Sequence, residues 1–147
     1  MGAVFRFTGN NTTYRTASKT FDYVVKVEGV RKYSVSALEK CAEDNSAVTD
    51  TSKETFVGNV YKIKAVPARE AMELADGSVK WCDVTDRYDV FVYVRAEGEI
   101  TPQSYVCKSG TEILMNRENY YTTRWSGFMG TVTDVGENLE EKEYSQN

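Results

Sequence analysis

Two stretches of the chain alternate apolar and polar residues with the two-residue period of a β-strand. The alternating apolar positions are Phe21, Tyr23, Val25 and Val27 in the first stretch and Val90, Val92, Val94 and Ala96 in the second. Because successive side chains of a strand point to opposite faces, all four apolar residues of each stretch share one face. The pattern therefore predicts two strands that each bury one face.

These two strands begin the two copies of an internal repeat. Residues 23–29 align with residues 92–98, and both segments end in Glu-Gly. Further along, residues 56–63 align with residues 128–135, and both segments begin Phe-x-Gly-x-Val. Two blocks in the same order at nearly the same separation indicate a duplication. Each copy is predicted to form a strand, an excursion and a second strand.

The two excursions differ. In the first, Ser36-Ala-Leu-Glu39 matches a capping box, which predicts one or two helical turns through Cys41. In the second, Ser109-Gly110 precedes a short strand that we expect over residues 111–115.

The segment between the copies favours a hairpin. Residues 75–78 read Ala-Asp-Gly-Ser, which is typical of a tight turn, and the residues after it alternate as in a strand. We expect Trp81 of this hairpin to lie in the core. The alternative is a helix over residues 67–75 with Pro67 in its first turn, which local propensity favours.

Together these elements predict a mainly β fold with minor α content. We expect a pseudo-two-fold barrel or sandwich built from two internal repeats, with a central hairpin and short helices. A chain of 147 residues suits a single domain, residues 1–147. Its expected parts are repeat one at about 21–66, the central hairpin at about 67–86, repeat two at about 87–136 and an acidic tail at 137–147. A further strand is expected at residues 4–7.

Composition removes several classes of function. The chain has no histidine, which excludes Ser-His-Asp and Cys-His sites and histidine metal ligands. The net charge is −4, and the tail holds four glutamates against one lysine, so the rest of the chain is nearly neutral and has no basic run for nucleic acid. No apolar run approaches the roughly 20 residues of a membrane helix. We expect a protein that is not an enzyme and has no cofactor, no metal and no nucleic-acid partner.

The three cysteines do not form a metal-binding motif. Cys41, Cys82 and Cys107 are far apart in the sequence and include no Cys-x-x-Cys pair. We interpret them as half-buried thiols that act as small hydrophobic side chains. A disulfide between Cys41 and Cys107 remains open as the alternative.

Three aspartates are a candidate calcium site. Asp83, Asp86 and Asp89 recur at three-residue spacing, and Ca²⁺ prefers several carboxylate and carbonyl oxygens. The segment lacks the glycine and the terminal glutamate of an EF-hand loop. A solvated turn before the strand at Tyr88 is therefore the favoured interpretation.

Aromatic residues gather in residues 116–126, which include the extra length of the second copy. The candidate binding residues there are Tyr120, Tyr121, Arg124 and Trp125. Loop insertions often carry binding functions, planar aromatics can stack on a sugar or a partner side chain, and arginine adds a fork of donors. The alternative is that Tyr121 and Trp125 close the end of the barrel.

Several glycine-containing and apolar segments resemble a bacterial family. They are residues 27–30, 56–60, 75–77, 88–94 and 127–135. The chain resembles the domain of unknown function 4330 family over most of its length. The resemblance implies a soluble domain on the extracytoplasmic face of a bacterial membrane, behind an amino-terminal membrane helix that this chain lacks, so that Met1-Gly2 is either a native start or a truncation scar. The family has no established activity and supplies no functional residues.

These observations predict a non-enzymatic interaction or scaffold module of the bacterial cell envelope. Its expected partner is an envelope protein, and it meets the membrane only through a helix outside this chain. The alternative is a lipid- or glycan-binding domain of a membrane-anchored envelope protein. An apolar tunnel in the folded domain would favour the binder, whereas a filled core with an exposed aromatic loop would favour the interaction module.

Overall fold

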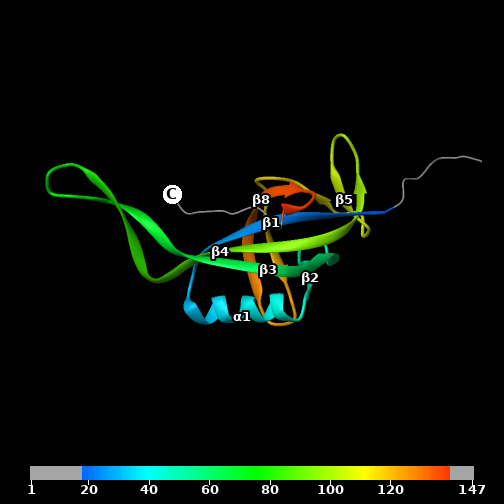
Figure 1. Ribbon diagram of the computed structural model, residues 1–147, viewed down its shortest axis with the longest axis horizontal. Helices are drawn as coiled ribbons and strands as arrows, with labels where there is room; N and C mark the ends of the chain where they lie inside the picture. The colour runs from blue at the N-terminus through cyan, green and yellow to red at the C-terminus, as the bar shows by residue number, and fades with distance from the viewer. Residues whose placement is uncertain (1–17, 140–147) are drawn as a thin grey trace, which may run out of the picture.

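Strands dominate the part of the chain that the structure describes, residues 18–139 of this computed structural model (Figure 1). The elements are β1 (Lys19–Val30), α1 (Lys32–Glu43), β2 (Ala47–Asp50), β3 (Thr55–Glu73), β4 (Val79–Ile100), β5 (Tyr105–Cys107), β6 (Glu112–Ile113), β7 (Glu118–Thr122) and β8 (Gly127–Gly136). The strand expected at residues 4–7 lies outside the described residues. The mainly β fold class is confirmed.

Six of these strands close into a ring. The sheet runs in the order β1-β8-β7-β2-β3-β4-β5-β6, and β1 also pairs with β4, so the first six strands form a barrel. Every pairing is antiparallel. A closed ring presents no free strand edge around its circumference. The short strands β5 and β6 continue the sheet beyond the barrel, from the end of β4.

The pairing register confirms the pseudo-two-fold repeat. Val24 pairs with Tyr93, and these residues are also equivalent in the sequence repeat. Val60 pairs with Val94. Their equivalents in the other copy are Val132 and Val25, and these two residues also pair. Strands β1, β2 and β3 therefore correspond to β4, β7 and β8. The strands of the two copies interlock around the ring and do not form separate halves.

The barrel interior is filled by the alternating residues of β1 and β4, all of which are buried as predicted. Helix α1 covers part of this core with Val35, Leu38 and Cys41. The expected helix start at Ser36 is wrong, because the N-cap is Arg31, which makes no side-chain capping bond. Burial of Val35 against the barrel draws the earlier residues into the helix, so packing overrides the local capping pattern.

The central hairpin is confirmed, and a helix over residues 67–75 is wrong. Strands β3 and β4 continue beyond the barrel as a paired arm, which projects from the body in Figure 1. The Leu74 amide donates to the Ser78 carbonyl at 2.8 Å, and Gly77 adopts a φ of 88°, which glycine accepts at low cost. Trp81 is 54% exposed, so its expected place in the core is wrong. The arm is a two-stranded ribbon, and nothing among residues 18–139 forms a second layer over it.

All three cysteines are free, and the alternative of a Cys41–Cys107 disulfide is wrong. Cys41 and Cys107 are buried, as expected for small hydrophobic side chains. The Cys41 sulfur lies 3.1 Å from the Thr123 hydroxyl, which ties α1 to the β7–β8 turn. None of the helical segments within residues 18–139 has the length and apolar character needed to cross a bilayer.

Candidate functional site

The four predicted aromatic and basic contact residues do not share one surface. Tyr121 is buried and stacks on Phe128 with ring centroids 5.5 Å apart, as its alternative interpretation expected, whereas Tyr120 is exposed. The segment 116–126 is not a loop insertion, because its strand β7 belongs to the ring and is the counterpart of β2. The two strands share no sequence pattern, so the repeat alignment missed their equivalence.

Trp125 is held against the end of α1. Its indole Nε1 donates to Asp44 Oδ2 at 2.8 Å, and the Lys40 ammonium and Arg124 guanidinium lie 5.2 and 5.3 Å from its ring. Hydrogen bonds from Ser46 and then from Trp125 lower the pKa of Asp44. Trp125 therefore links the β7–β8 turn to the end of α1, and part of its side chain stays exposed. Binding through Tyr120, Arg124 and Trp125 stays a prediction.

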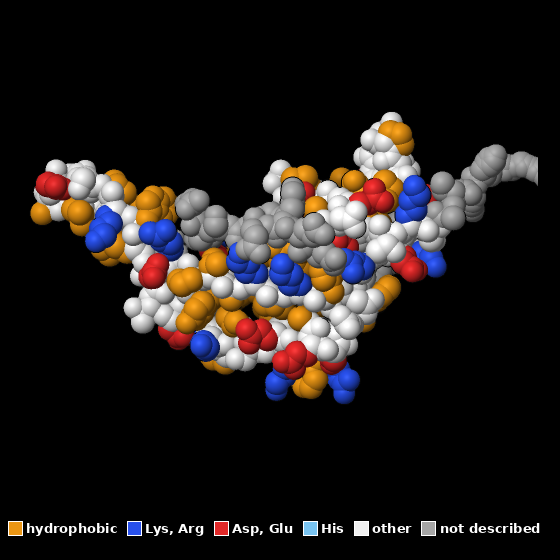
Figure 2. Space-filling view, viewed as in Figure 1, with side chains coloured by type: hydrophobic (Ala, Val, Ile, Leu, Met, Phe, Trp, Pro, Cys, Tyr) orange, Lys and Arg blue, Asp and Glu red, His pale blue; other side chains and the backbone are white. Residues whose placement is uncertain are grey.

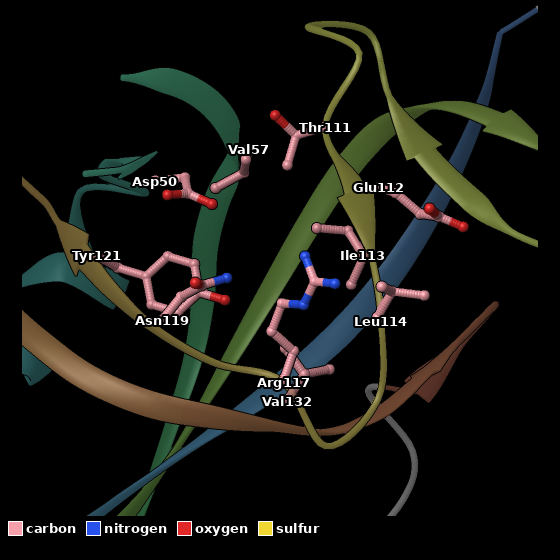
Figure 3. A pocket seen from close by; sticks show the side chains of 10 residues that line it. All are labelled: Asp50, Val57, Thr111, Glu112, Ile113, Leu114, Arg117, Asn119, Tyr121 and Val132. Carbon is pink, nitrogen blue, oxygen red and sulfur yellow. The ribbon is translucent and has the colours of Figure 1, made fainter. Parts of the chain in front are cut away.

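The barrel has a filled interior. Figure 3 shows a small indentation at the β6–β7 end of the barrel, lined by the side chains of Asp50, Arg117 and Tyr121 among others. Its volume is about 10 Å³, about enough for one water molecule. The Asp50 carboxylate accepts hydrogen bonds from the Ser52 amide at 3.1 Å and the Ser52 hydroxyl at 2.8 Å, which organises the β2–β3 turn. Within residues 18–139 no apolar tunnel crosses the core.

The three candidate calcium ligands lie in strand β4 and do not converge. Asp83 pairs with an arginine at 3.6 Å, Asp86 pairs with another at 3.2 Å, and Asp89 accepts the Gly29 amide at 3.1 Å. The solvated turn expected here is replaced by strand β4, in which Asp83 and Asp89 pair with β3, whereas Asp86 lies in the register shift between them and has a φ of 56°. No group of three or more metal-ligating side chains occurs in the described part of the chain.

A groove of about 500 Å³ opens on the outer surface of the barrel across the start of β3 and the end of β4. We call it the Phe56 groove. Its principal lining residues are Phe56, Asn59, Tyr61, Arg95, Glu97 and Lys108. Phe56 is 49% exposed, although aromatic residues of this barrel are mostly buried.

Two irregularities in β3 shape this groove. The pairing of β3 with β4 shifts between Val60 and Lys62, so Tyr61 is an extra residue that stands on the outer face. The pairing of β3 with β2 shifts at Val57, which is buried and leaves Phe56 facing outward. The Tyr23 hydroxyl donates to the Val57 carbonyl at 2.6 Å from inside the core. A buried hydroxyl thus stabilises the backbone that exposes Phe56.

The floor of the Phe56 groove is a fixed ionic and aromatic layer. Arg95 donates to the buried carboxylate of Asp22 through Nε at 2.9 Å and Nη2 at 3.3 Å, and its guanidinium lies 4.2 Å from the Tyr61 ring. Asp22 also accepts the Tyr61 hydroxyl and the Leu139 amide, each at 3.1 Å. A carboxylate with several donors holds its partners in one geometry.

The walls of the groove carry polar groups in fixed positions. Asn45 donates its amide nitrogen to the Val60 carbonyl at 3.0 Å, and Asn59 donates to the Asn45 carbonyl at 2.9 Å. The Lys108 ammonium lies 3.4 Å from the Glu97 carboxylate, and the Lys108 amide donates to the Glu97 carbonyl at 2.9 Å. These groups present both donors and acceptors to whatever enters.

The second copy contains a counterpart, which we call the Met129 groove. Lys26, Glu28, Gly130 and Thr131 line it, and they are equivalent to Arg95, Glu97, Gly58 and Asn59 of the Phe56 groove. Its volume is about 250 Å³, half that of the Phe56 groove. In place of the exposed phenyl ring it has the flexible side chain of Met129.

The arm, residues 67–86, carries the other unusual surface. Val79 is 62% exposed, and Met72, Leu74 and Trp81 are exposed as well. Figure 2 shows apolar side chains along this projection, among charged ones. Sequence analysis found the hairpin but not its exposure, since apolar residues beside a turn also occur in buried hairpins.

A family model described as "Domain of unknown function (DUF4330)" matches residues 1–136. No curated protein and no solved structure matches the chain.

Proposed function

This chain belongs to the domain of unknown function 4330 family, and we propose that it is a non-enzymatic interaction module that binds a protein partner through the arm. The observation that carries this proposal is the exposure of four large apolar side chains on a ribbon that projects beyond the barrel. Contiguous exposed apolar surface is characteristic of interaction sites.

Both faces of the arm are apolar near the tip. Ala71 pairs with Trp81 and Glu73 pairs with Val79, so Trp81 and Val79 share one face. Met72 and Leu74 lie on the other face. A partner that covers both faces excludes more water than one that docks on a single face.

Charge selects the class of partner. The arm has five acidic residues, Glu70, Glu73, Asp76, Asp83 and Asp86, against the basic residues Arg69 and Lys80. This excess repels anionic lipid and the arm of a second copy. It fits a protein partner whose apolar surface is bordered by lysine or arginine.

The filled barrel favours an interaction module over a carrier of lipid, because a lipid chain needs an apolar cavity far larger than the one-water space at the barrel end. The family resemblance supports a location in the bacterial cell envelope, on the extracytoplasmic face of the membrane. We therefore propose an envelope protein as the partner.

Photo-crosslinking in cells tests the arm. A photoreactive residue at Val79 is expected to give one discrete protein adduct, and the same residue at the exposed Lys53 is expected to give none. The attached partner segment should contain apolar residues beside lysine or arginine. As a synthetic peptide it should bind the purified chain more weakly as salt rises.

Matched variants make this test decisive. Trp81→Ser should weaken the peptide about tenfold, because exposed tryptophans at interfaces contribute disproportionately. Met129→Ser removes an equally exposed apolar side chain from the barrel surface and should change nothing. An adduct with lipid or with a second copy, or an equal loss of peptide affinity in both variants, would show that the arm does not bind a protein partner.

A further inference from the structure

We propose that the Phe56 groove is a binding site for a neutral oligosaccharide. This site lies on the barrel wall, apart from the arm, and nothing in the proposed protein interaction requires it. The inference rests on an exposed aromatic platform, on fixed polar groups of both hydrogen-bonding types, on balanced charge and on the contrast with the Met129 groove.

The platform is the ring of Phe56. The Ser109 hydroxyl donates to the Phe56 carbonyl at 2.8 Å, and the Val57 carbonyl is held by Tyr23, so the backbone on both sides of the ring is fixed. One face of a pyranose ring presents C–H groups, and such a face packs against an aromatic ring. A preorganised ring loses little entropy when it binds.

The polar groups match sugar hydroxyls. A hydroxyl both donates and accepts, and the groove provides the Arg95 and Lys108 donors, the Glu97 acceptor and the two asparagine amides. The hydrogen bonds of Asn45 and Asn59 to backbone carbonyls hold both amide planes in place. Fixed planar groups of this kind can contact neighbouring hydroxyls of one ring.

Charge favours a neutral ligand. Arg95 is neutralised by Asp22 at 2.9 Å, and Lys108 lies beside Glu97 at 3.4 Å. An anion would compete with the two carboxylates for these basic groups, and a cation would compete with the basic groups for the carboxylates. A ligand without net charge disturbs neither pair.

Strand topology disfavours a peptide. β3 pairs with β2 and, from Asn59 onward, with β4, and the Phe56 and Val57 carbonyls already accept hydroxyl groups, so little strand edge is left to which a peptide backbone could add. The Met129 groove shares this topology but lacks the aromatic platform and both asparagines. It therefore serves as an internal control on the same barrel.

The test is a titration of the full chain, followed by amide chemical shifts, with cellotetraose, maltotetraose and chitotetraose as separate probes. At least one of these neutral tetrasaccharides should give saturable shifts at Asn59, Glu97 and Lys108. Tetragalacturonate, which is anionic, and tetraalanine, a peptide, should bind at least about tenfold more weakly.

Variants assign the binding to the groove. Phe56→Ser should weaken the best tetrasaccharide about tenfold, and Asn59→Ala about fivefold, whereas Met129→Ser should leave its affinity unchanged. All three positions are exposed, so the variants should keep the parent spectrum elsewhere.

The proposal is overturned if no neutral tetrasaccharide binds with a dissociation constant below about 10 mM. It is also overturned if tetragalacturonate or tetraalanine binds more tightly, or if Phe56→Ser and Met129→Ser have the same effect. The crosslinking result at Val79 is independent of these outcomes, so either proposal can fail alone.

Discussion

The two copies of the repeat place the same phenylalanine on opposite sides of the barrel wall. Phe56 and Phe128 are equivalent in sequence, yet Phe56 is 49% exposed and Phe128 is 5% exposed. Their neighbours show the reverse, because Val57 is buried and Met129 is 54% exposed. In β8 the pairing with β7 is continuous, whereas in β3 the pairing with β2 shifts at Val57. One extra residue in a strand is enough to reverse which side chains face outward.

A core residue explains where the shift occurs. The Val57 carbonyl accepts the hydroxyl of buried Tyr23, while the residue equivalent to Tyr23 in the second copy is Val92, which has no hydroxyl. In the copy with the donor β3 shifts against β2, and in the copy without the donor β8 pairs with β7 without a shift. Both copies thus keep the barrel pairings, and the buried hydrogen bond coincides with the strand shift that sets the two grooves apart.

The largest expected difference between the copies is in the stability cost of removing each phenyl ring. Phe128→Ala should lower the free energy of unfolding by about 3–4 kcal/mol, because it leaves a cavity against Tyr121. Phe56→Ala should cost about 0.5 kcal/mol, as expected at an exposed site. Urea denaturation of both variants measures the difference. Equal costs would mean that the two rings are equally buried in solution.

How much of the fold could be predicted from the sequence depends on how far apart in the chain the interacting residues lie. The alternation in β1 and β4 and the turn at residues 75–78 are local, so the strands and the hairpin were predicted correctly. The exposure of Trp81 depends on whether another element covers the arm, and no local pattern records that none of the described elements does.

The candidate site was less accessible to sequence analysis for the same reason. The shift at Val57 depends on a hydroxyl 34 positions away in the chain, and Arg95 finds Asp22 across 73 positions. The equivalence of β2 and β7 appears only in their pairing, because the two strands share no motif. The groove residues therefore could not be singled out from the repeat.

Substitution of the equivalent glycines is expected to have the next largest effect on stability in the two copies. A Cβ on Gly58 would lie 2.7 Å from both the Arg95 carbonyl oxygen and Val94 Cγ1, and its φ of 127° is unfavourable for other residues. On Gly130 a Cβ would overlap Val25 and lie 2.8 Å from the Lys26 carbonyl oxygen, without a positive φ. Gly58→Val should cost about 3 kcal/mol and Gly130→Val about 2 kcal/mol. Thermal unfolding checks the order, and a cost below about 0.5 kcal/mol at both positions would show that the repeated glycine is not structural.

Removing the buried hydroxyl tests the proposed origin of the difference directly. Tyr23→Phe should cost about 2 kcal/mol, because the buried Val57 carbonyl loses its donor. Tyr105→Phe, a change at a half-buried tyrosine whose ring contacts Phe21, should cost less than about 0.5 kcal/mol. Chemical shifts of the Phe56 ring in Tyr23→Phe should broaden or move. An unchanged Phe56 environment would separate the hydrogen bond from the strand shift.

The mildest perturbation of the same region is alkaline pH. Burial raises the pKa of Cys107 to about 11, and burial with the nearby Tyr121, Cys107 and Asp50 raises the pKa of Tyr23 well above its usual value. In the unfolded chain these groups ionise near about 8.5 and 10. Above about pH 8.5 the unfolded state therefore binds fewer protons than the folded state, and stability falls as pH rises. Urea midpoints should decline between pH 9 and 11, with Cys107→Ala reducing the earlier part of the decline and Tyr23→Phe the later part. If the urea midpoint declined with the same slope in both variants and in the parent, groups other than Cys107 and Tyr23 would be responsible for the loss of stability.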